Sequence, residues 1–257
     1  IALKLLRLAG LEDVPVASGI KRPLLRDRPI LGWSGHEGKR FLTPEDEDLK
    51  PCGLHAVDLI VSKIMSMKKE ITLVCVGPLT NLAAAIIREP RIVDNVRDVV
   101  IMGGVIRLFD GLNLPYREHN ILCDPEAAKI VFSSGMPITM VPLDVTLKVF
   151  IERRDLEKIR AAGTPIADAV ASMIEHYLGV VKRDFTWLHD PLALATLIDE
   201  SLVKKVGMKI LVETKGEYTT GLTLALPPKA DEKPVKVCVD VNAARFKKLF
   251  MEKICAK

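Results

Sequence analysis

Two short segments hold most of the residues in this sequence that could do chemistry. The string EHNILCDPEAA begins with a carboxylate, Glu118, and places a carboxamide, Asn120, two residues later. In the string LHDPLA an imidazole and a carboxylate stand side by side as His189 and Asp190. These groups can bind hydroxyls, ligate a cation and titrate near neutral pH. The inventory is typical of a hydrolase that acts on a sugar.

Each of these groups also has a purely structural interpretation. Asp190, with Pro191 after it, is typical of a helix N-cap, and a lone His189 is more often packed or exposed than catalytic. In an extended backbone Glu118 and Asn120 would point the same way and could bind neighbouring hydroxyls. Otherwise they are loop groups that satisfy the local backbone. The residues by themselves leave both interpretations open.

Glycines mark two further places where backbone could approach a ligand closely. Val76-Gly77 and Met102-Gly103-Gly104 each follow an apolar run, and glycine allows such close approach. In an open parallel sheet, ligands bind at the carboxyl ends of the strands, which is where these exits fall. The sequence contains neither G-x-x-x-x-G-K-[ST] nor G-x-G-x-x-G, which argues against a phosphate-binding or dinucleotide-binding protein.

The elements that must position these residues alternate between apolar runs and helical patterns. Such alternation predicts an α/β fold, an open, mostly parallel, Rossmann-like sheet with helices on both faces. No linker or repeat interrupts it, so residues 1–257 are predicted to form one domain. Strands are expected at 14–17, 71–76, 97–102, 136–141, 206–212 and 235–241, and helices at 1–8, 54–67, 79–88, 124–132, 152–160, 166–181 and 242–255. The run at 71–76 is expected to be buried on both faces.

Composition excludes several other classes of protein. The 257 residues are 49% hydrophobic and 27% charged, which is ordinary for a soluble globular chain. The net charge of +4 is dispersed and aromatics are 5%, so no nucleic-acid partner is predicted. No apolar run approaches the roughly 18 residues that cross a bilayer, so no membrane partner is predicted. Five widely spaced cysteines predict a reducing, cytoplasmic compartment.

Read in their order along the chain, several segments strongly resemble the inosine-uridine preferring nucleoside hydrolase family. The segments are VGPLTNLA at 76–83, IMGG at 101–104, residues 113–128, VPLDVT at 141–146 and HDPLA at 189–193. Two C-terminal segments, YTTGLT at 218–223 and VCVDVN at 237–242, are similar to the ending of that family. The resemblance therefore covers nearly the whole chain.

This resemblance implies hydrolysis of the N-glycosidic bond of ribonucleosides, with calcium as the cofactor. It implies that Asp190 and the backbone carbonyl of Val76 bind calcium, and that His189 assists departure of the base. It also implies that the ribose is held or lined by Met102, Asn113, Glu118 and Asn120. The partner is then a ribonucleoside substrate, and by the same resemblance we expect a homodimer or homotetramer.

The sequence departs from the family at its start. The family begins with a strand that ends in an Asp-rich loop, D-x-D-x-x-x-D-D, which supplies most calcium carboxylates and the general base. The acidic run at 45–48 lies elsewhere, and residues 1–20 are similar to the family's second helix and second strand. We therefore expect an N-terminally incomplete domain, with little activity and weak calcium affinity by itself. The alternative is a non-catalytic remnant that retains a ribose-binding cleft.

Overall fold

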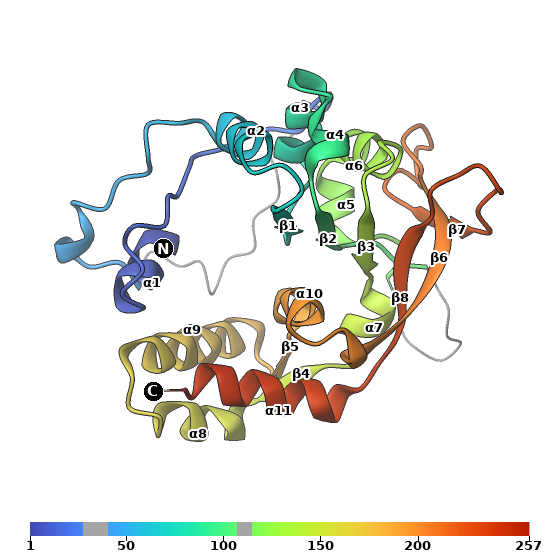
Figure 1. Ribbon diagram of the computed structural model, residues 1–257. Helices are drawn as coiled ribbons and strands as arrows, with labels where there is room; N and C mark the ends of the chain where they lie inside the picture. The colour runs from blue at the N-terminus through green and yellow to red at the C-terminus, as the bar shows by residue number, and fades with distance from the viewer. Residues whose placement is uncertain (28–40, 107–114, 257) are drawn as a thin grey trace.

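A computed structural model describes residues 1–27, 41–106 and 115–256 (Figure 1). In this part of the chain the main sheet has the order β1-β2-β3-β8-β6-β7. Its strands are β1 Thr72–Cys75, β2 Asp98–Met102, β3 Ile138–Val141, β8 Val235–Val241, β6 Val203–Val212 and β7 Thr223–Leu226. The first four in this order are parallel, while β6 and β7 are antiparallel to their neighbours. The predicted open, mostly parallel sheet is confirmed.

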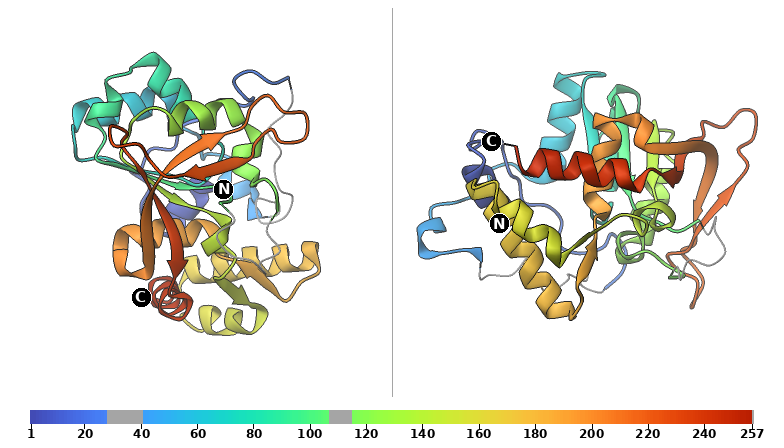
Figure 2. Two further views of the ribbon diagram at one scale, coloured as in Figure 1. Left: turned by 90° about the vertical axis from the view of Figure 1, so that its right-hand side faces the viewer. Right: turned by 90° about the horizontal axis from the view of Figure 1, so that it is seen from below.

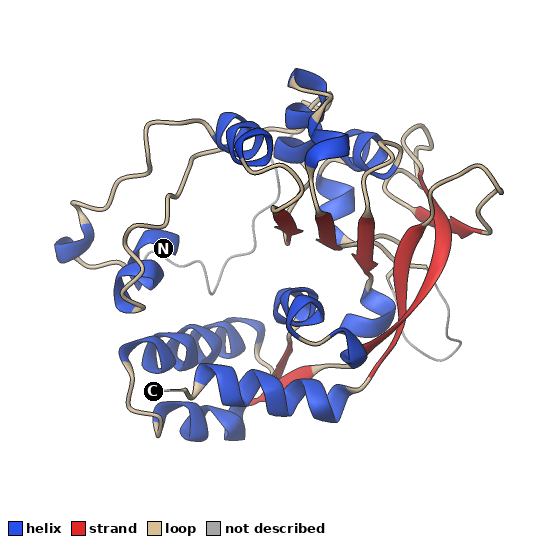
Figure 3. Ribbon diagram, viewed as in Figure 1, coloured by secondary structure: helices blue, strands red, loops and turns tan. Residues whose placement is uncertain are grey.

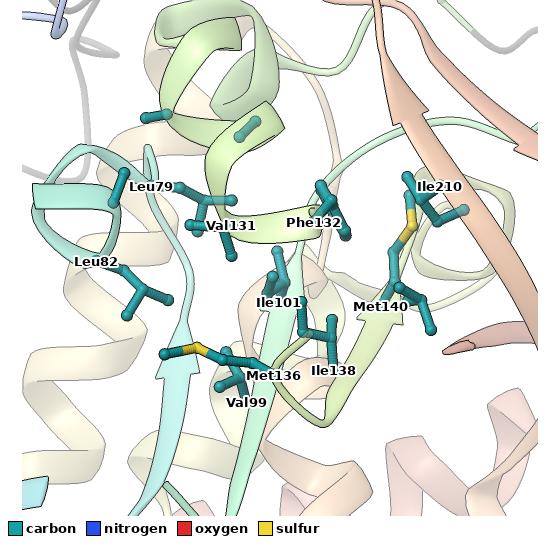
Figure 4. Close-up of a cluster of buried hydrophobic side chains, with 14 of the residues drawn as sticks. Leu79, Leu82, Val99, Ile101, Val131, Phe132, Met136, Ile138, Met140 and Ile210 are labelled. Carbon is teal, nitrogen blue, oxygen red and sulfur yellow. The ribbon is translucent and has the colours of Figure 1, made fainter. Parts of the chain in front are cut away.

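Helices cover both faces of this sheet, as the alternation of strands and helices predicts (Figure 2). Along β2, Val99 and Ile101 point into one buried cluster, whereas Val100 and Met102 point into another. The first cluster lies against α2 Ala56–Ser66, α3 Thr80–Arg88 and α6 Pro125–Phe132. Figure 4 shows its centre, where Ile101 of β2 and Met140 of β3 face Val131 and Phe132 of α6. The second cluster lies against α7 Leu143–Thr146, α10 His189–Ile198 and α11 Ala243–Ile254.

A small second layer joins α7 to α10 (Figure 3). Strands β4 Phe150–Glu152 and β5 Phe185–Trp187 pair antiparallel, and the chain between them forms α8 Leu156–Arg160 and α9 Pro165–Val181. The start of α9 follows from its sequence, because Thr164 accepts a hydrogen bond from the Ala167 N–H and Pro165 needs no partner at the first helical position. Since β5 leads directly into α10, this layer fixes where the His189 helix begins.

Shorter elements complete the chain. They are α1 Ala2–Leu8, α4 Ile92–Asn95, α5 His119–Cys123 and the 3-10 turns Pro44–Asp46, Arg153–Asp155 and Glu200–Leu202. The helix expected at 152–160 is therefore shorter than predicted, because β4 extends to Glu152 and a 3-10 turn follows it.

The strand expected at 14–17 is wrong. Pro15 has no N–H to donate. Among the described residues, the Val14 N–H donates to the Leu11 carbonyl at 3.1 Å and the Val16 carbonyl accepts from the Cys52 N–H at 2.8 Å, and an isolated bridge between Ser18 and His55 follows the segment. Residues 14–17 are therefore an extended connection. It carries the chain from α1, which packs against α9, back to the sheet.

The burial expected for the strand at 71–76 is also wrong. Every residue of β1 is half-buried, because within the described part of the chain β1 pairs only with β2 and stands at the edge of the sheet. Helix α10 is also partly uncovered, since its residues Leu194, Leu197 and Ile198 are exposed. Apolar surface thus remains accessible along β1 and α10.

Candidate functional site

The carboxyl ends of three neighbouring strands gather most of the predicted site residues. β1 ends just before Val76, β2 ends at Met102, and β3 ends just before α7, which carries Thr146. The register pairs Met102 with Val141 on the next strand, and α10 packs against β2. The residues therefore come from separate parts of the sequence to one edge of the sheet. Asn113, predicted to hold the ribose, lies outside the described residues.

Glu118 is a buried carboxylate held by backbone amides. It is the N-cap of α5, and its Oε1 accepts from the Asn120 N–H at 2.8 Å. Its Oε2 accepts from the N–H groups of Ile121 at 3.0 Å and Gly104 at 3.2 Å. Gly103 lies beside the same carboxylate, where a Cβ would come within 3.3 Å of Oε2. The carboxylate is thus fixed between α5 and the end of β2.

The Glu118 carboxylate retains hydrogen-bonding capacity for a ligand. An ionised carboxylate offers about four acceptor positions, and the three amides fill three of them. Burial raises the pKa of the Glu118 carboxyl above its ordinary value, and the three amide donors oppose that rise. A hydroxyl that donated to the remaining position would favour the charged form in the same way.

Asn120 stands beside Glu118, but not for the reason that the sequence suggested. The expectation of an extended backbone is wrong, because Asn120 lies inside α5 and Glu118 caps that helix. The Asn120 Nδ2 donates to the Met102 carbonyl at 3.1 Å and lies 3.5 Å from the Met102 sulfur. Three predicted ribose residues, Met102, Glu118 and Asn120, are therefore brought into one buried cluster. The Asn120 Oδ1 accepts no hydrogen bond from the described residues and is left for a ligand.

His189 forms the other half of the site with Thr146. Its Nδ1 lies 2.7 Å from the Thr146 Oγ1, and Thr146 is fully buried at the end of α7. The Trp187 ring also lies near the His189 ring, with their centroids 6.0 Å apart. Burial lowers the pKa of His189 from 6.5 to about 4, so the ring is neutral near pH 7. When the Thr146 hydroxyl donates to Nδ1, the single ring proton lies on Nε2, from which it can be donated.

Asp190 and Val76, the predicted metal ligands, are both accessible. The prediction that Asp190 caps its helix is wrong: α10 begins at His189, so Asp190 lies in the first turn, where its charge favours the helix dipole. Asp190 is exposed and Val76 is 41% exposed. Calcium takes six to eight oxygen ligands. Within residues 1–27, 41–106 and 115–256, no three His, Cys, Asp or Glu side chains form a group that could hold a metal, so these residues do not fit a complete calcium site.

Sequence reasoning missed three buried polar residues around the site. Thr146 contacts His189, Asp144 accepts from the Ile106 N–H at 2.8 Å, and Thr223 contacts Val105 at both its N–H and its carbonyl. Their segments, VPLDVT and YTTGLT, carried the family resemblance without indicating a role for these side chains. A buried Thr or Asp is seen to be a partner only when the fold shows which donor it faces.

A buried carboxylate that caps a helix and a neighbouring amide, both at the carboxyl ends of parallel strands, form a site suited to a polyhydroxyl ligand. The model of the family "Inosine-uridine preferring nucleoside hydrolase" matches residues 1–248, and the chain belongs to this family. A pyrimidine-specific ribonucleoside hydrolase, RihA of Photobacterium profundum, is 36% identical over 265 residues, covering 98% of this chain and 84% of that protein.

Solved structures agree with the family and with the fold. A purine-preferring ribonucleoside hydrolase from Gardnerella vaginalis has a TM-score of 0.88 at 30% identity, covering 99% of this chain and 84% of that one. The plant nucleoside hydrolase PpNRh1 has a TM-score of 0.84 at 31% identity, covering 100% of this chain and 85% of that one. Nucleoside hydrolases are generally metal-dependent. Among the described residues no helix has the length and apolar character needed to cross a membrane, and the five cysteines, all of them described, form no disulfide.

Proposed function

We propose that this chain carries the ribose-binding and base-binding part of a ribonucleoside hydrolase. The observation that carries the proposal is the Glu118–Asn120 cluster at the end of β2, with acceptor positions left on both side chains. Vicinal ribose hydroxyls are donors that suit those two acceptors. Met102, which contacts Asn120, lies where it would line the sugar. The Asn113 side chain is proposed, from the resemblance alone, as a further hydroxyl ligand.

The chemistry that these residues support is cleavage of the bond between the ribose C1′ and the base nitrogen. The bonding electron pair leaves with the base, water supplies the hydroxyl at C1′, and the departing nitrogen accepts a proton. Positive charge develops on the ribose in such a reaction, so a buried carboxylate near the hydroxyls stabilises the transition state more than the ground state. A neutral His189 can donate a hydrogen bond from its Nε2–H to the departing base nitrogen, with Thr146 fixing the ring, and the proton that this nitrogen finally takes up is the one released by the attacking water.

The nucleobase preference has to be measured, because the relatives differ. RihA of Photobacterium profundum is described as pyrimidine-specific, whereas the Gardnerella vaginalis enzyme is described as purine-preferring. The assay is hydrolysis of uridine and of inosine by the full chain, followed by detection of free ribose.

The deciding variant is Glu118→Gln. Its amide would place N–H groups against the backbone donors of Gly104 and Ile121, and the transition-state charge would be uncompensated. We expect a loss of kcat/KM of roughly 100-fold. Glu70→Gln, at an exposed glutamate, is the matched control and should retain full activity. Equal rates for the two variants would refute the role given to Glu118.

A second candidate function is ribose or nucleoside binding without hydrolysis. The observation that favours it is the lack of any cluster of three metal-binding side chains in the part of the chain that the structure describes. Titration calorimetry with uridine, inosine and ribose separates the two candidates. Binding with no release of ribose would support this second function, whereas no binding of any of the three would contradict both.

We propose further that calcium is the metal, with the Asp190 carboxylate and the Val76 carbonyl as the ligands from this chain. A bound calcium would activate the attacking water, and the two groups alone predict weak affinity. A ligand at 100 times its dissociation constant stabilises a fold by about 2.7 kcal/mol. Calcium should therefore raise the melting temperature of the wild type and of Asp231→Asn, an exposed control, but not that of Asp190→Asn. Equal shifts in all three would contradict this assignment.

Three other predictions from the resemblance and the composition stay proposals. We propose that residues 1–257 form one domain, because the two buried clusters share one sheet and β2 contributes side chains to both. We also propose a homodimer or homotetramer and a cytoplasmic location. A single calorimetric unfolding transition, light scattering and cell fractionation, respectively, test these three proposals.

A further inference from the structure

Each backbone N–H of the residues that follow β2 donates a hydrogen bond to a different part of the molecule. In residues 103–106, here called the 103–106 segment, the Gly103 N–H donates to the Val141 carbonyl of β3 at 3.3 Å. The next three N–H groups donate to side chains: Gly104 to Glu118, Val105 to Thr223 and Ile106 to Asp144. All three accepting side chains are buried.

Thr223 makes the closest of these contacts. Its Oγ1 accepts from the Val105 N–H at 2.8 Å and donates to the Val105 carbonyl at 2.6 Å. Thr223 is the first residue of β7 and is 7% exposed. One hydroxyl thus fixes both polar groups of a single peptide residue.

The 103–106 segment has little freedom to adjust. Gly104 has φ +81, and a Cβ there would lie 2.3 Å from the Met140 Cε and 3.1 Å from the Thr223 Oγ1. The Gly104 carbonyl accepts from the Leu143 N–H at 3.0 Å. The segment therefore passes between Met140 and Thr223 in a conformation that favours glycine.

Both proposed ribose ligands rest on this stretch of backbone. Glu118 takes a hydrogen bond from the Gly104 N–H, and Asn120 donates to the carbonyl of Met102, immediately before the segment. A shift at Val105 would move Gly104 and with it the Glu118 carboxylate. The side chain that prevents this shift comes from a hairpin 118 residues further along the chain.

We propose that Thr223 is a positioning residue for ribose binding, acting through the 103–106 segment on Glu118 and Asn120. The inference rests on the proposed function of that site. Thr223 itself does not contact the ribose. Its role is to hold the Gly104 N–H, and therefore the free acceptor positions of Glu118, where vicinal hydroxyls can reach them.

The test compares Thr223→Val, which keeps the shape of the side chain but loses both hydrogen bonds, with Thr223→Ser, which keeps the hydroxyl. The matched control is Thr220→Val on the same hairpin. Thr220 is equally buried, and its hydroxyl donates to the Gly216 carbonyl, within the hairpin, at 2.5 Å. Measurements are the dissociation constant of ribonucleoside by titration calorimetry, KM and kcat separately, and hydrogen exchange at Gly104 and Val105.

We expect Thr223→Val to weaken nucleoside binding between about 10-fold and 100-fold. Exchange at Gly104 and Val105 should also become faster. Thr223→Ser should restore most of the affinity, and Thr220→Val should bind as the wild type does although it loses stability. If Thr223→Val does not fold, Thr223→Cys, whose thiol is a weak donor and acceptor, gives the same comparison.

Two results would overturn the inference. One is normal affinity and KM in Thr223→Val despite lower stability, and the other is an equal loss of affinity in Thr220→Val. A wild type that binds no nucleoside would instead contradict the proposed function. In that case the exchange rates alone would still show whether Thr223 fixes the 103–106 segment.

Discussion

At the scale of single residues, the site depends on two ionisable groups whose pKa values are shifted by burial. Burial raises the pKa of Glu118 while three backbone amides oppose that rise, and burial lowers the pKa of His189 to about 4, so its ring is neutral near pH 7. The amides thus favour the charged form of Glu118, which could accept a hydroxyl, whereas burial favours the neutral form of His189. Neither pKa shift can be predicted from the residue type.

The state of His189 leads to a prediction about stability and pH. Its folded pKa of about 4 lies below the ordinary 6.5, so as the pH falls through this interval the unfolded chain takes up a proton that the folded chain does not. The free energy of unfolding should fall by up to roughly 3 kcal/mol from this residue between pH 7 and 4.

Urea unfolding at several pH values measures this effect as a difference between variants, because other groups titrate in the same range. His189→Gln should lose less stability on acidification than the wild type, while His176→Gln, at another half-buried histidine, should follow the wild type. Parallel curves for all three proteins would show that His189 is protonated in the folded state near its ordinary pKa.

At the scale of elements, caps decide where helices begin and end. Thr164 and Asp124 start α9 and α6 as their sequences indicate, with hydrogen bonds to Ala167 and Ala127. The end of α9 is less favourable, because Lys182 adopts φ 52 and ψ 50, the left-handed region. A side chain with a Cβ is strained there, whereas glycine is not.

Replacing this residue should stabilise the protein. Lys182→Gly removes the strain, and we expect a gain of about 0.5–1 kcal/mol in the free energy of unfolding. Lys182→Ala removes the same long side chain but keeps the Cβ, so it should give no comparable gain. Thermal unfolding of the three proteins gives the result, and a Gly variant no more stable than the Ala variant would contradict the explanation.

Many elements were predictable because their signals are local. The strand expected at 235–241 and the helix expected at 124–132 follow from apolar pattern and capping alone, and both appear as β8 and α6. The short helix α5 was not predicted, since its start depends on Glu118 reaching amides that only the fold supplies. The half-burial of β1 was missed for a related reason: the sequence of a strand does not say that it stands at a sheet edge.

At the scale of the whole molecule, one buried side chain joins three distant segments. The Asp124 Oδ2 accepts from the Leu24 N–H at 2.9 Å and from the Thr80 hydroxyl at 2.8 Å, while Oδ1 caps α6. Arg26 adds a two-pronged ion pair with Glu126 nearby. The N-terminal segment is therefore attached to α3 and α6 through a fully buried carboxylate.

Asp124→Asn should weaken this attachment, because the amide group would face donors instead of accepting from them. We expect a loss of roughly 3 kcal/mol and faster tryptic cleavage after the exposed Lys21. Thr164→Ala, which removes a cap that bonds within its own helix, should cost about 1 kcal/mol and leave cleavage after Lys21 unchanged. Cleavage that rises equally in both variants would show that Asp124 acts only through general stability.

The contact between Thr223 and Val105 has a consequence for the order of events during synthesis. Thr223 of β7 must leave the ribosome before it can form its hydrogen bonds to Val105, in the backbone after β2. β8 must be synthesised after that, because it lies between β3 and β6 in the sheet. Glu118 and Asn120 would be translated long before their supporting hydroxyl. A nascent chain that is stopped before residue 223 should therefore contain Glu118 and Asn120, the proposed sugar-binding residues, but fail to retain a nucleoside.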